Sequence, residues 1–335
     1  MEQPKKTKKR LLAGCILCAA LGLPLFLPRK SSISVRFSPD SLSRALPLPG
    51  QTGACNPYCS LSVPTQITRI GNDYFLVDCY HNQILTSPSP ETPLSEWQVM
   101  TDRINKGHTI AGDGTVYLAD DTENNRILVF LKIKERFCLS QVFENMGLRP
   151  HYVCYDPEEA RFLALSSMTG ELYVFRRSPG TCTVELETIL SVPELKGVYV
   201  RSFTLDGDFI YFPACNGTIL QTRKEDLRVL KRFTVPDQYG GMVQLSRIEN
   251  SFYLTVSTDL WGDPSRAAIL RAEDLSRLDL AQDISSCFAG NGTPYYISCF
   301  DGAYFLTKHC IIPGTDVFTF RPGEQGPEQI RLLPF

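Results

Sequence analysis

The stretch "HTIAGDGTVYLADDTENNRILVF", residues 108–130, has the pattern of three short β-strands joined by two turns. Short runs rich in apolar residues lie on both sides of Asp113-Gly114, a pair that favours a tight hairpin turn. A polar segment, residues 121–125, then precedes a third apolar run. The expected strands are 108–111, 116–119 and 126–130. The stretch therefore predicts a small antiparallel sheet.

Similar units recur along the chain. They begin at Ile67, His108, His151, Arg201, Gln244 and Tyr296, at spacings of 41, 43, 50, 43 and 52 residues. Each holds three strand-like segments, and runs such as 185–190, 228–235 and 328–335 can supply a fourth. Four strands every 40 to 50 residues or so are typical of a propeller blade, which buries its faces only against neighbouring blades. The chain is therefore predicted to be an all-β protein with a six-bladed β-propeller over residues 65–335.

The second unit resembles an NHL repeat. The resemblance lies in Asp113-Gly114, in "VYLAD" at 116–120 and in "NNRILVF" at 124–130. The first unit keeps part of this pattern, and the other four keep only its hydrophobic skeleton. The resemblance implies a six-bladed propeller, in a family that includes binding scaffolds, lactonase-type enzymes and a zinc-dependent amidating lyase. One fold hosts many functions, so the fold does not choose among these.

The first thirty residues predict a membrane segment ahead of the propeller. Residues 1–10 are basic, and residues 11–27 are uncharged and largely apolar, near the shortest length that spans a bilayer. A basic flank before the apolar run predicts a cytoplasmic N-terminus. We therefore expect a cytoplasmic tail (1–10), a transmembrane signal-anchor (11–27) and a propeller outside the cytoplasm, in a single-pass protein of the cell membrane. A cleaved secretory signal and a lipoprotein signal at "LAGC", 12–15, are the alternatives.

The charge balance argues against nucleic acid as a partner. Residues 1–30 carry seven Lys or Arg and one acid, which leaves 27 basic (34 − 7) and 35 acidic (36 − 1) residues in the rest of the chain. That remainder has a net charge of −8 (27 − 35). A nucleic-acid-binding domain usually carries a basic patch, so we expect no nucleic-acid partner.

Residues 28–64 are predicted to be a linker, because they are rich in Pro, Ser and Gly. Within them, "SISVRF" at 32–37 alternates like a strand that could join the outer edge of a blade. Cys55 and Cys59, in "CNPYC", permit a local disulfide around Pro57 or two free thiols. A three-residue spacer without a second cysteine pair is a poor zinc signature.

Two Asn-Gly-Thr triplets begin at Asn216 and Asn291. They would be glycosylation sites in a eukaryotic secretory route. Asn-Gly is also the favoured pair of a two-residue hairpin turn. We expect a turn at both positions.

The residue five before the first turn is polar in five of the six units. First strands of blades line the channel of a propeller, so equivalent positions form a ring around it. We therefore predict a ligand site at the channel mouth, where the blade walls converge. Its residues are His108, His151, Arg201, Gln244 and Tyr296. A hydrated channel lining without a ligand is the alternative.

Arg201 gives this ring a fixed charge, because a guanidinium stays protonated at ordinary pH. The partner is therefore expected to be an anionic or polar small molecule, with a protein partner as the other option. The two ring histidines are each expected to gain charge below about pH 6.5 and to strengthen anion binding in mild acid. The leading interpretation is binding without catalysis and without a cofactor.

A metal-dependent enzyme with its site in the channel is the alternative function. His108 and His151 would lie on adjacent blades, and imidazole suits zinc. A catalytic zinc site usually needs a third protein ligand, and His81 and His309 fall outside the ring. The resemblance to the lyase implies a histidine cluster with an arginine and a tyrosine. Arg201 and Tyr296 are of those types but match no quotable motif, so we predict no metal site.

Lactonase-type propellers are the second enzyme class that the resemblance implies, with a calcium ion held by acidic side chains and Asn. Asp78 and Asp120 follow the second strands of the first two units, and later units have no acid there. We expect these two aspartates to bond local backbone amides.

Four cysteines recur at equivalent positions. Cys154 and Cys299 match in the third and sixth units, and Cys79 and Cys215 match in the first and fourth. Equivalent positions on separate blades are too far apart for a disulfide. We expect free, buried thiols at all four.

Overall fold

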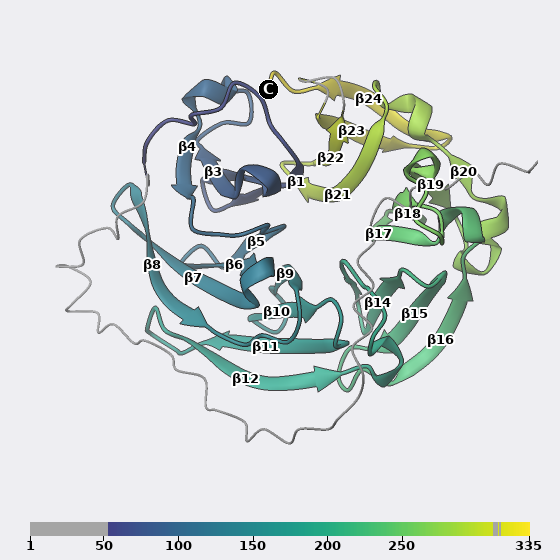
Figure 1. The fold of residues 1–335 in the computed structure, drawn as a ribbon, viewed down its shortest axis with the longest axis horizontal. Coiled ribbons are helices and arrows are strands. Elements are labelled where there is room, and N and C mark those ends of the chain that lie inside the picture. Colours follow the sequence, from purple (N-terminus) through teal and green to yellow (C-terminus); the bar gives the residue numbers. More distant parts are fainter. Residues whose placement is uncertain (1–52, 311–313, 315) are drawn as a thin grey trace, which may run out of the picture. The chain divides into compact units, whose positions relative to one another are not determined.

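The computed structural model describes residues 53–310, 314 and 316–335. In it, six four-stranded antiparallel sheets form a ring around a central axis (Figure 1). Each sheet is built from four consecutive strands, with the first strand of each sheet nearest the axis. The predicted all-β, six-bladed propeller is confirmed.

The blades follow one another in chain order. The strands of the first three are β1 (Pro64–Ile70), β2 (Asp73–Asp78), β3 (Gln83–Ser87), β4 (Gln98–Thr101), β5 (Ile110–Gly112), β6 (Val116–Asp121), β7 (Arg126–Ile133), β8 (Arg136–Phe143), β9 (Pro150–Asp156), β10 (Arg161–Ser166), β11 (Glu171–Arg177) and β12 (Val184–Ser191). Those of the last three are β13 (Thr204–Asp206), β14 (Phe209–Ala214), β15 (Thr218–Arg223), β16 (Val229–Thr234), β17 (Gly241–Ile248), β18 (Ser251–Thr258), β19 (Ala268–Ala272), β20 (Gln282–Asp283), β21 (Gly292–Phe300), β22 (Ala303–Cys310), β23 (Val317–Gly323) and β24 (Gly326–Leu332).

Short 3₁₀ turns connect many of the strands. They are η1 (Cys79–His81), η2 (Leu94–Glu96), η3 (Thr122–Asn124), η4 (Pro193–Leu195), η5 (Asp237–Tyr239), η6 (Pro264–Arg266), η7 (Leu275–Leu280) and η8 (Ser285–Cys287). Among the described residues, no helix is long and apolar enough to cross a membrane.

The second blade shows how local chemistry sets the strand pattern. The Asp113 carboxylate accepts the backbone N–H groups of Thr115 and Val116 at 2.8 and 2.9 Å, and Gly114 takes the left-handed conformation (φ +85°) that the turn needs. The polar segment after β6 forms η3, and β7 then pairs with β6. All three strands expected in this stretch are present.

The two Asn-Gly pairs behave differently. Asn216-Gly217 lies in the turn between β14 and β15, with Gly217 at φ +75°, which confirms the first expected turn. Asn291-Gly292 lies where the chain crosses from η8 into β21, and Gly292 is already the first residue of that strand. The second expected turn is wrong because the segment before it belongs to a crossing between blades.

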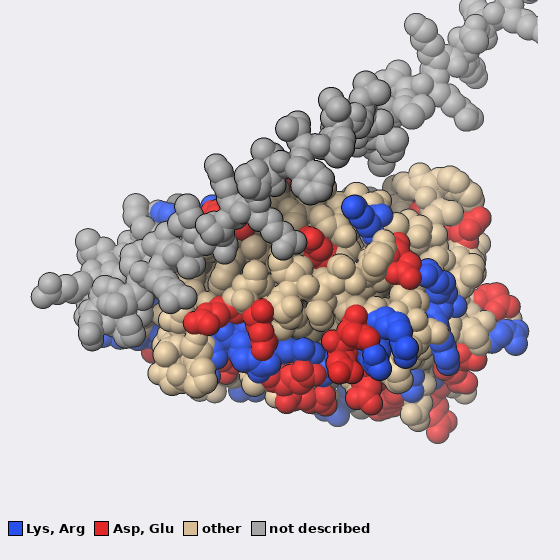
Figure 2. Space-filling model, turned by 90° about the horizontal axis from the view of Figure 1, so that it is seen from below, with Lys and Arg blue, Asp and Glu red and all other residues tan. Residues whose placement is uncertain are grey.

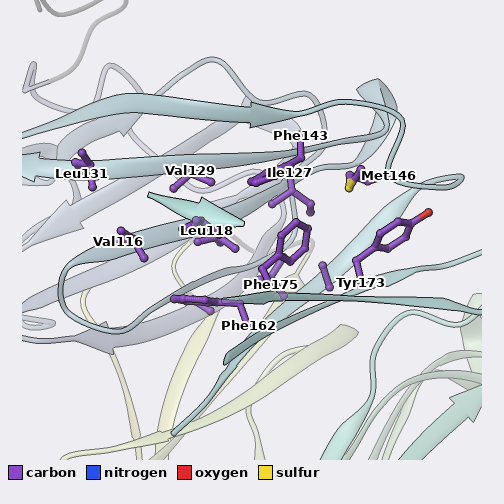
Figure 3. Packing of buried hydrophobic residues seen from close by; sticks show 14 residues of the cluster. Val116, Leu118, Ile127, Val129, Leu131, Phe143, Met146, Phe162, Tyr173 and Phe175 are labelled. Carbon is purple, nitrogen blue, oxygen red and sulfur yellow. The ribbon is translucent and has the colours of Figure 1, made fainter. Parts of the chain in front are cut away.

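Apolar side chains fill every gap between neighbouring blades. Six separate clusters occur, one for each pair of adjacent sheets. Figure 3 shows the cluster between the second and third blades, where Val129, Phe162 and Phe175 are fully buried. Since each blade covers a face of the next, the hydrophobic effect acts around the whole ring.

Side chains close the ring between the first and last blades. Among the described strands, each sheet takes all four of its strands from one continuous stretch. The Thr307 hydroxyl donates to the carbonyl of Thr65 at 2.6 Å. The rings of Trp97 and Phe335 pack edge to face, 5.6 Å apart. Closure therefore depends on packing and polar contacts between the two blades.

The described end of the predicted linker contacts the first blade. The backbone of residues 53–56 bonds to β4, with Gly53 N–H donating to Val99 O at 2.8 Å and Asn56 N–H donating to Trp97 O at 2.7 Å. The strand-like segment 32–37 and the predicted membrane segment 11–27 lie outside the described residues.

Charged side chains of both signs are interleaved on the side of the propeller that Figure 2 shows. Exposed ion pairs such as Arg176–Glu187 (3.2 Å) are part of this surface chemistry. Such pairs contribute little to stability, because water screens them.

Candidate functional site: the two mouths of the channel

The channel has two ends with different linings. The innermost strands all run in the same direction along the axis, because each is the first strand of an equivalent blade. Their starts therefore meet at one end and their ends at the other. A cavity of about 180 Å³ at the first end, here called the histidine mouth, is lined by Tyr80, Lys106, His108, Glu123, Arg149, His151, Tyr199, Arg201 and Tyr295. A cavity of about 230 Å³ at the second end is here called the opposite mouth.

His108 is fixed by hydrogen bonds on both ring nitrogens. Asp120 Oδ2 accepts its backbone N–H at 2.9 Å. The Thr122 hydroxyl has acceptors at Asp120 and at the Pro150 carbonyl, both 2.8 Å away, so its oxygen accepts Nδ1–H of His108 at 3.1 Å. Nε2 then faces the Cys79 thiol at 3.7 Å. Burial raises the pKa of this thiol, which therefore remains a weak S–H donor.

His151 lies in a hydrogen-bond chain with a defined direction. The Tyr296 hydroxyl donates to the carbonyl of Arg201 at 3.1 Å, so its oxygen accepts Nδ1–H of His151 at 3.1 Å. Nε2 of His151 then accepts the hydroxyl proton of Tyr199 at 3.0 Å. The His151 imidazole is thereby held as the neutral tautomer protonated on Nδ1.

The two imidazoles stack, with ring centroids 3.6 Å apart and planes 25° from parallel. Burial lowers the pKa of His151 well below its usual range, and the neighbouring His108, Arg201 and Arg149 side chains lower it further. The expectation that His151 gains charge below about pH 6.5 is therefore wrong.

Because all four ring nitrogens of His108 and His151 have protein partners, neither ring offers a free metal ligand. Among the described residues, no three His, Cys, Asp or Glu side chains form a group suited to a metal ion.

Two cations of this mouth were missed by the sequence analysis. Lys106 and Arg149 each stand two residues before a ring histidine, on successive blades. Both have left-handed backbone, with φ of +57° and +58°. The repeated spacing of a cation, one residue and a histidine was the signal that could have revealed them.

The same device holds both cations. Asn82 and Asn125 take left-handed backbone and cap η1 and η3. The Asn82 side-chain oxygen accepts the backbone N–H of Lys106 at 3.0 Å, and that of Asn125 accepts the backbone N–H of Arg149 at 2.7 Å. Each blade thus positions the cation of the next blade.

The backbone beside Lys106 is tightly enclosed. A Cβ on Gly107 would lie 2.6 Å from the carbonyl oxygen of Asp120, so only glycine fits between Lys106 and His108.

Arg201 is half-buried beneath the mouth. Its guanidinium donates to the Ser257 hydroxyl and lies 5.2 Å from the centre of the Tyr199 ring. Arg201 forms no ion pair with a carboxylate of the described residues. With Lys106, Arg149 and Arg201 positive and Glu123 negative, the Lys, Arg and Glu side chains give the lining a charge of +2 (3 − 1).

The predicted ring does not come together as one site. His108, His151 and Arg201 line the histidine mouth. Tyr296 is buried below them and bonds to His151. Gln244 lines the opposite mouth instead, where its amide donates to Ile297 O at 3.3 Å and accepts Ile297 N–H at 2.6 Å.

Counting back from the turn failed because the first turn is longer in the third blade than in the fifth. Four residues separate the paired Asp156 and Arg161, but two separate the paired Ile248 and Ser251, so the position of Gln244 matches Tyr152 and not His151. Gln66 accepts the backbone N–H of Ile110 at 2.8 Å, just as Gln244 does with Ile297 on a later blade. Gln66 is therefore the counterpart of Gln244, while Ile67 is fully buried between the first and sixth blades.

Asp78 and Asp120 bond backbone amides as predicted, but these amides lie 11 to 16 residues earlier in the chain and are not local. Asp78 accepts the backbone N–H groups of Ser62 and Val63 at 3.0 and 3.1 Å and contacts His81 Nδ1 at 2.6 Å. Asp120 accepts the N–H groups of His108 and Thr109 at 2.9 and 2.7 Å. Both carboxylates are fully buried and satisfied by backbone amides.

The opposite mouth has a lining with two thiols and one cation. Its lining includes Tyr152, Tyr155, Phe203, Tyr304, Arg247 and the two thiols Cys154 and Cys299. Cys154 and Cys299 thus face one channel end from the third and sixth blades. Cys299 is exposed beside the turn at Asp301, so the expectation of a buried thiol there is wrong.

The other cysteines vary in exposure. Cys79 is buried as expected, whereas Cys154 and Cys215 are only half-buried. Cys55 and Cys59 are exposed free thiols, so the local disulfide is not formed.

Solved structures share the propeller fold at low sequence identity. A candidate 6-phosphogluconolactonase from Bacteroides uniformis matches with a TM-score of 0.56 at 12% identity, covering 83% of this chain and 86% of that one. A similar protein from Bacteroides fragilis gives 0.57 at 12%, with 82% and 84% covered. Hydrazine synthase from Kuenenia stuttgartiensis gives 0.53 at 12%, with 78% and 77% covered. No family model and no curated protein matches the chain, so these comparisons support the propeller fold alone.

Proposed function

We propose that the propeller binds a small anionic molecule at the histidine mouth, without catalysing its conversion. One observation carries the proposal: Lys106, Arg149 and Arg201 come from three successive blades and line one cavity that holds a single carboxylate. An anion there would be attracted by several charges in a partly enclosed space, where water screens them less than at an open surface.

The cavity is largely preformed, which favours binding. The Asn82 and Asn125 contacts fix the backbone of Lys106 and Arg149, and the Ser257 contact restrains Arg201. Groups already ordered lose little conformational freedom when a ligand arrives. At about 180 Å³ the cavity is below the size of a drug-like site, so the ligand is small.

Calorimetry with sulfate, inorganic phosphate and acetate at constant ionic strength tests the proposal on the full chain. Binding of at least one anion is expected, and Arg201→Ala should weaken it about ten- to hundredfold, the effect of losing a charge-assisted hydrogen bond. Arg247→Ala removes a cation of the opposite mouth and serves as the matched control. Equal effects of the two variants, or no binding of any anion, would overturn the proposal.

The alternative function is lactone hydrolysis in an NHL-like propeller. Two of the similar structures are named as candidate 6-phosphogluconolactonases, and a phosphorylated lactone is an anion that the same cavity would attract. Hydrolysis of 6-phosphogluconolactone by the full chain, lost in Arg201→Ala, would favour this alternative over binding alone.

We also propose that residues 11–27 anchor the propeller outside the cytoplasm, with residues 1–10 on the cytoplasmic side. The basic flank and the uncharged run support this topology. A protease added to intact cells should cleave within residues 28–52 and leave residues 1–10 intact. Mature protein that lacks residues 1–27 by mass would show a cleaved signal instead.

A further inference from the structure

We infer that the histidine mouth selects short dicarboxylic acids, with one carboxylate at Lys106 and the other at Arg201. This inference rests on the proposed anion-binding function and names the ligand class. The distribution of charge around the cavity, the chemistry of its floor and its size carry the argument.

The two unneutralised cations of the cavity come from blades that are not adjacent in the ring. Lys106, from the second blade, lies 3.6 Å from the centre of the Tyr80 ring and forms no ion pair with a described carboxylate. Arg201, from the fourth blade, contacts the Ser257 hydroxyl and the Tyr199 ring. A ligand in the cavity therefore meets two available positive charges, held on separate blades.

The blade between them presents a neutralised cation. Arg149, from the third blade, donates to the Glu123 carboxylate at 2.6 Å. The lining thus has positive charge at two separated points, with a compensated pair between them. A compact dianion such as phosphate would meet one of these points, whereas a ligand with two separate carboxylates would meet both.

The floor suits the uncharged middle of such a ligand. This part of the lining is the stacked pair His108 and His151, which are buried (7% and 2% exposed) and whose nitrogens already have partners. Rings whose nitrogens already have partners offer few hydrogen bonds to the hydroxyls of a ligand, whereas methylene groups need none. This pattern of polar ends and an apolar middle matches a short-chain diacid.

The size of the cavity limits the chain length. A volume of about 180 Å³ is equivalent to about six water molecules at roughly 30 Å³ each. Succinate and glutarate are therefore suitable probes, and butyrate is the monocarboxylate of similar length.

Calorimetry on the full chain should show succinate or glutarate binding about tenfold or more tightly than butyrate, since the second carboxylate gains a charge-assisted contact. Lys106→Met should reduce the affinity for the diacid to that for butyrate and leave butyrate binding unchanged. Arg201→Met should weaken both ligands. The thermal midpoint of each variant shows whether it remains folded.

Glu123→Gln provides a gain-of-binding test. The substitution frees Arg149 as a third cation. Citrate, with three carboxylates, should therefore bind several-fold more tightly to Glu123→Gln than to the unmodified protein. Glu187→Gln, which breaks the exposed ion pair with Arg176 on the outer part of the same blade, is the matched control and should change nothing.

The outcomes separate this inference from the proposed function. Diacids and butyrate binding alike, phosphate binding as tightly as the best diacid, or Lys106→Met weakening butyrate and diacid equally would each overturn diacid selection and leave anion binding in place. Absence of binding by every anion would overturn the proposed function itself.

Discussion

The two mouths of one channel differ in how their polar groups are held. At the histidine mouth, Asn82 and Asn125 fix the cations, and Tyr199 and Tyr296 bond to both nitrogens of His151. At the opposite mouth, aromatic side chains and two thiols line the wall, and Gln244 bonds to the backbone of the next blade. The difference indicates that a propeller can restrict a charged site to one end of its channel while the other end serves packing.

The largest expected effect comes from breaking the cation-positioning device. Asn125→Ala places alanine, which tolerates left-handed backbone less well than asparagine, at this position and removes the acceptor of the Arg149 N–H. These two losses together should lower the free energy of unfolding by about 2–4 kcal/mol, as measured by urea denaturation. Asn125→Gly permits the backbone but removes the acceptor, and should cost less. If Asn125→Gly were as stable as the unmodified protein and bound anions equally well, the device would have no role.

Tyr296→Phe tests the two hydrogen bonds that the Tyr296 hydroxyl makes beneath the histidine mouth. It leaves His151 Nδ1–H and the Arg201 carbonyl without their partner, so the free energy of unfolding should fall by about 1–3 kcal/mol. Tyr304→Phe at the opposite mouth removes a half-buried hydroxyl beside Cys299 and is the comparison. Equal losses in the two variants would contradict the view that the histidine mouth is the more tightly built end.

Acid should destabilise the protein through His151. Its pKa is lowered in the folded state by burial first and by neighbouring positive charge second, while in the unfolded chain it is about 6.5. The unfolded chain therefore binds the proton first as pH falls, and the stability contributed by neutral His151 is lost below about pH 6.5, by up to about 1.4 kcal/mol per pH unit. Urea denaturation at several pH values gives the free energy of unfolding as a function of pH. Below about pH 6.5 this free energy should fall less steeply with decreasing pH in His151→Gln than in the unmodified protein. His309→Gln changes an exposed histidine and should leave the slope unaltered; the same slope in both variants would argue against the assignment.

The smallest effect concerns the thiols of the opposite mouth. Cys299 is exposed, whereas burial raises the pKa of Cys154, so iodoacetamide should label Cys299 well before Cys154. Peptide mass spectrometry measures the two rates. Because Cys299 lies at the opposite mouth, its alkylation should leave anion binding unchanged. Loss of binding on labelling Cys299 alone would place the ligand at the wrong end.

The sequence predicted the fold well, because its signals are local. Each of these signals depends on a few neighbouring residues. They are the Asp113-Gly114 turn, the polar segment that becomes η3 and the recurrence of apolar runs. The site was predicted only in part. The first turn holds four residues in the third blade and two in the fifth, so Gln244 matches Tyr152 and not His151, and these turn lengths follow from strand pairing that composition does not encode.

Lys106 and Arg149 were missed for a related reason. Their direction depends on left-handed backbone fixed by an asparagine of the previous blade, a contact between residues 24 apart in sequence. The neutrality of His151 likewise depends on Tyr296, 145 residues away, and on burial. Contacts between blades decide these properties, so they emerge only from the assembled ring.

A crystal structure of the full chain grown with succinate tests the central claim most directly. The account predicts succinate in the histidine mouth, with one carboxylate at the Lys106 ammonium and the other at the Arg201 guanidinium, above the stacked histidine rings. Succinate in the opposite mouth against Tyr152 and Arg247, or an empty histidine mouth at a concentration that saturates binding in calorimetry, would contradict it.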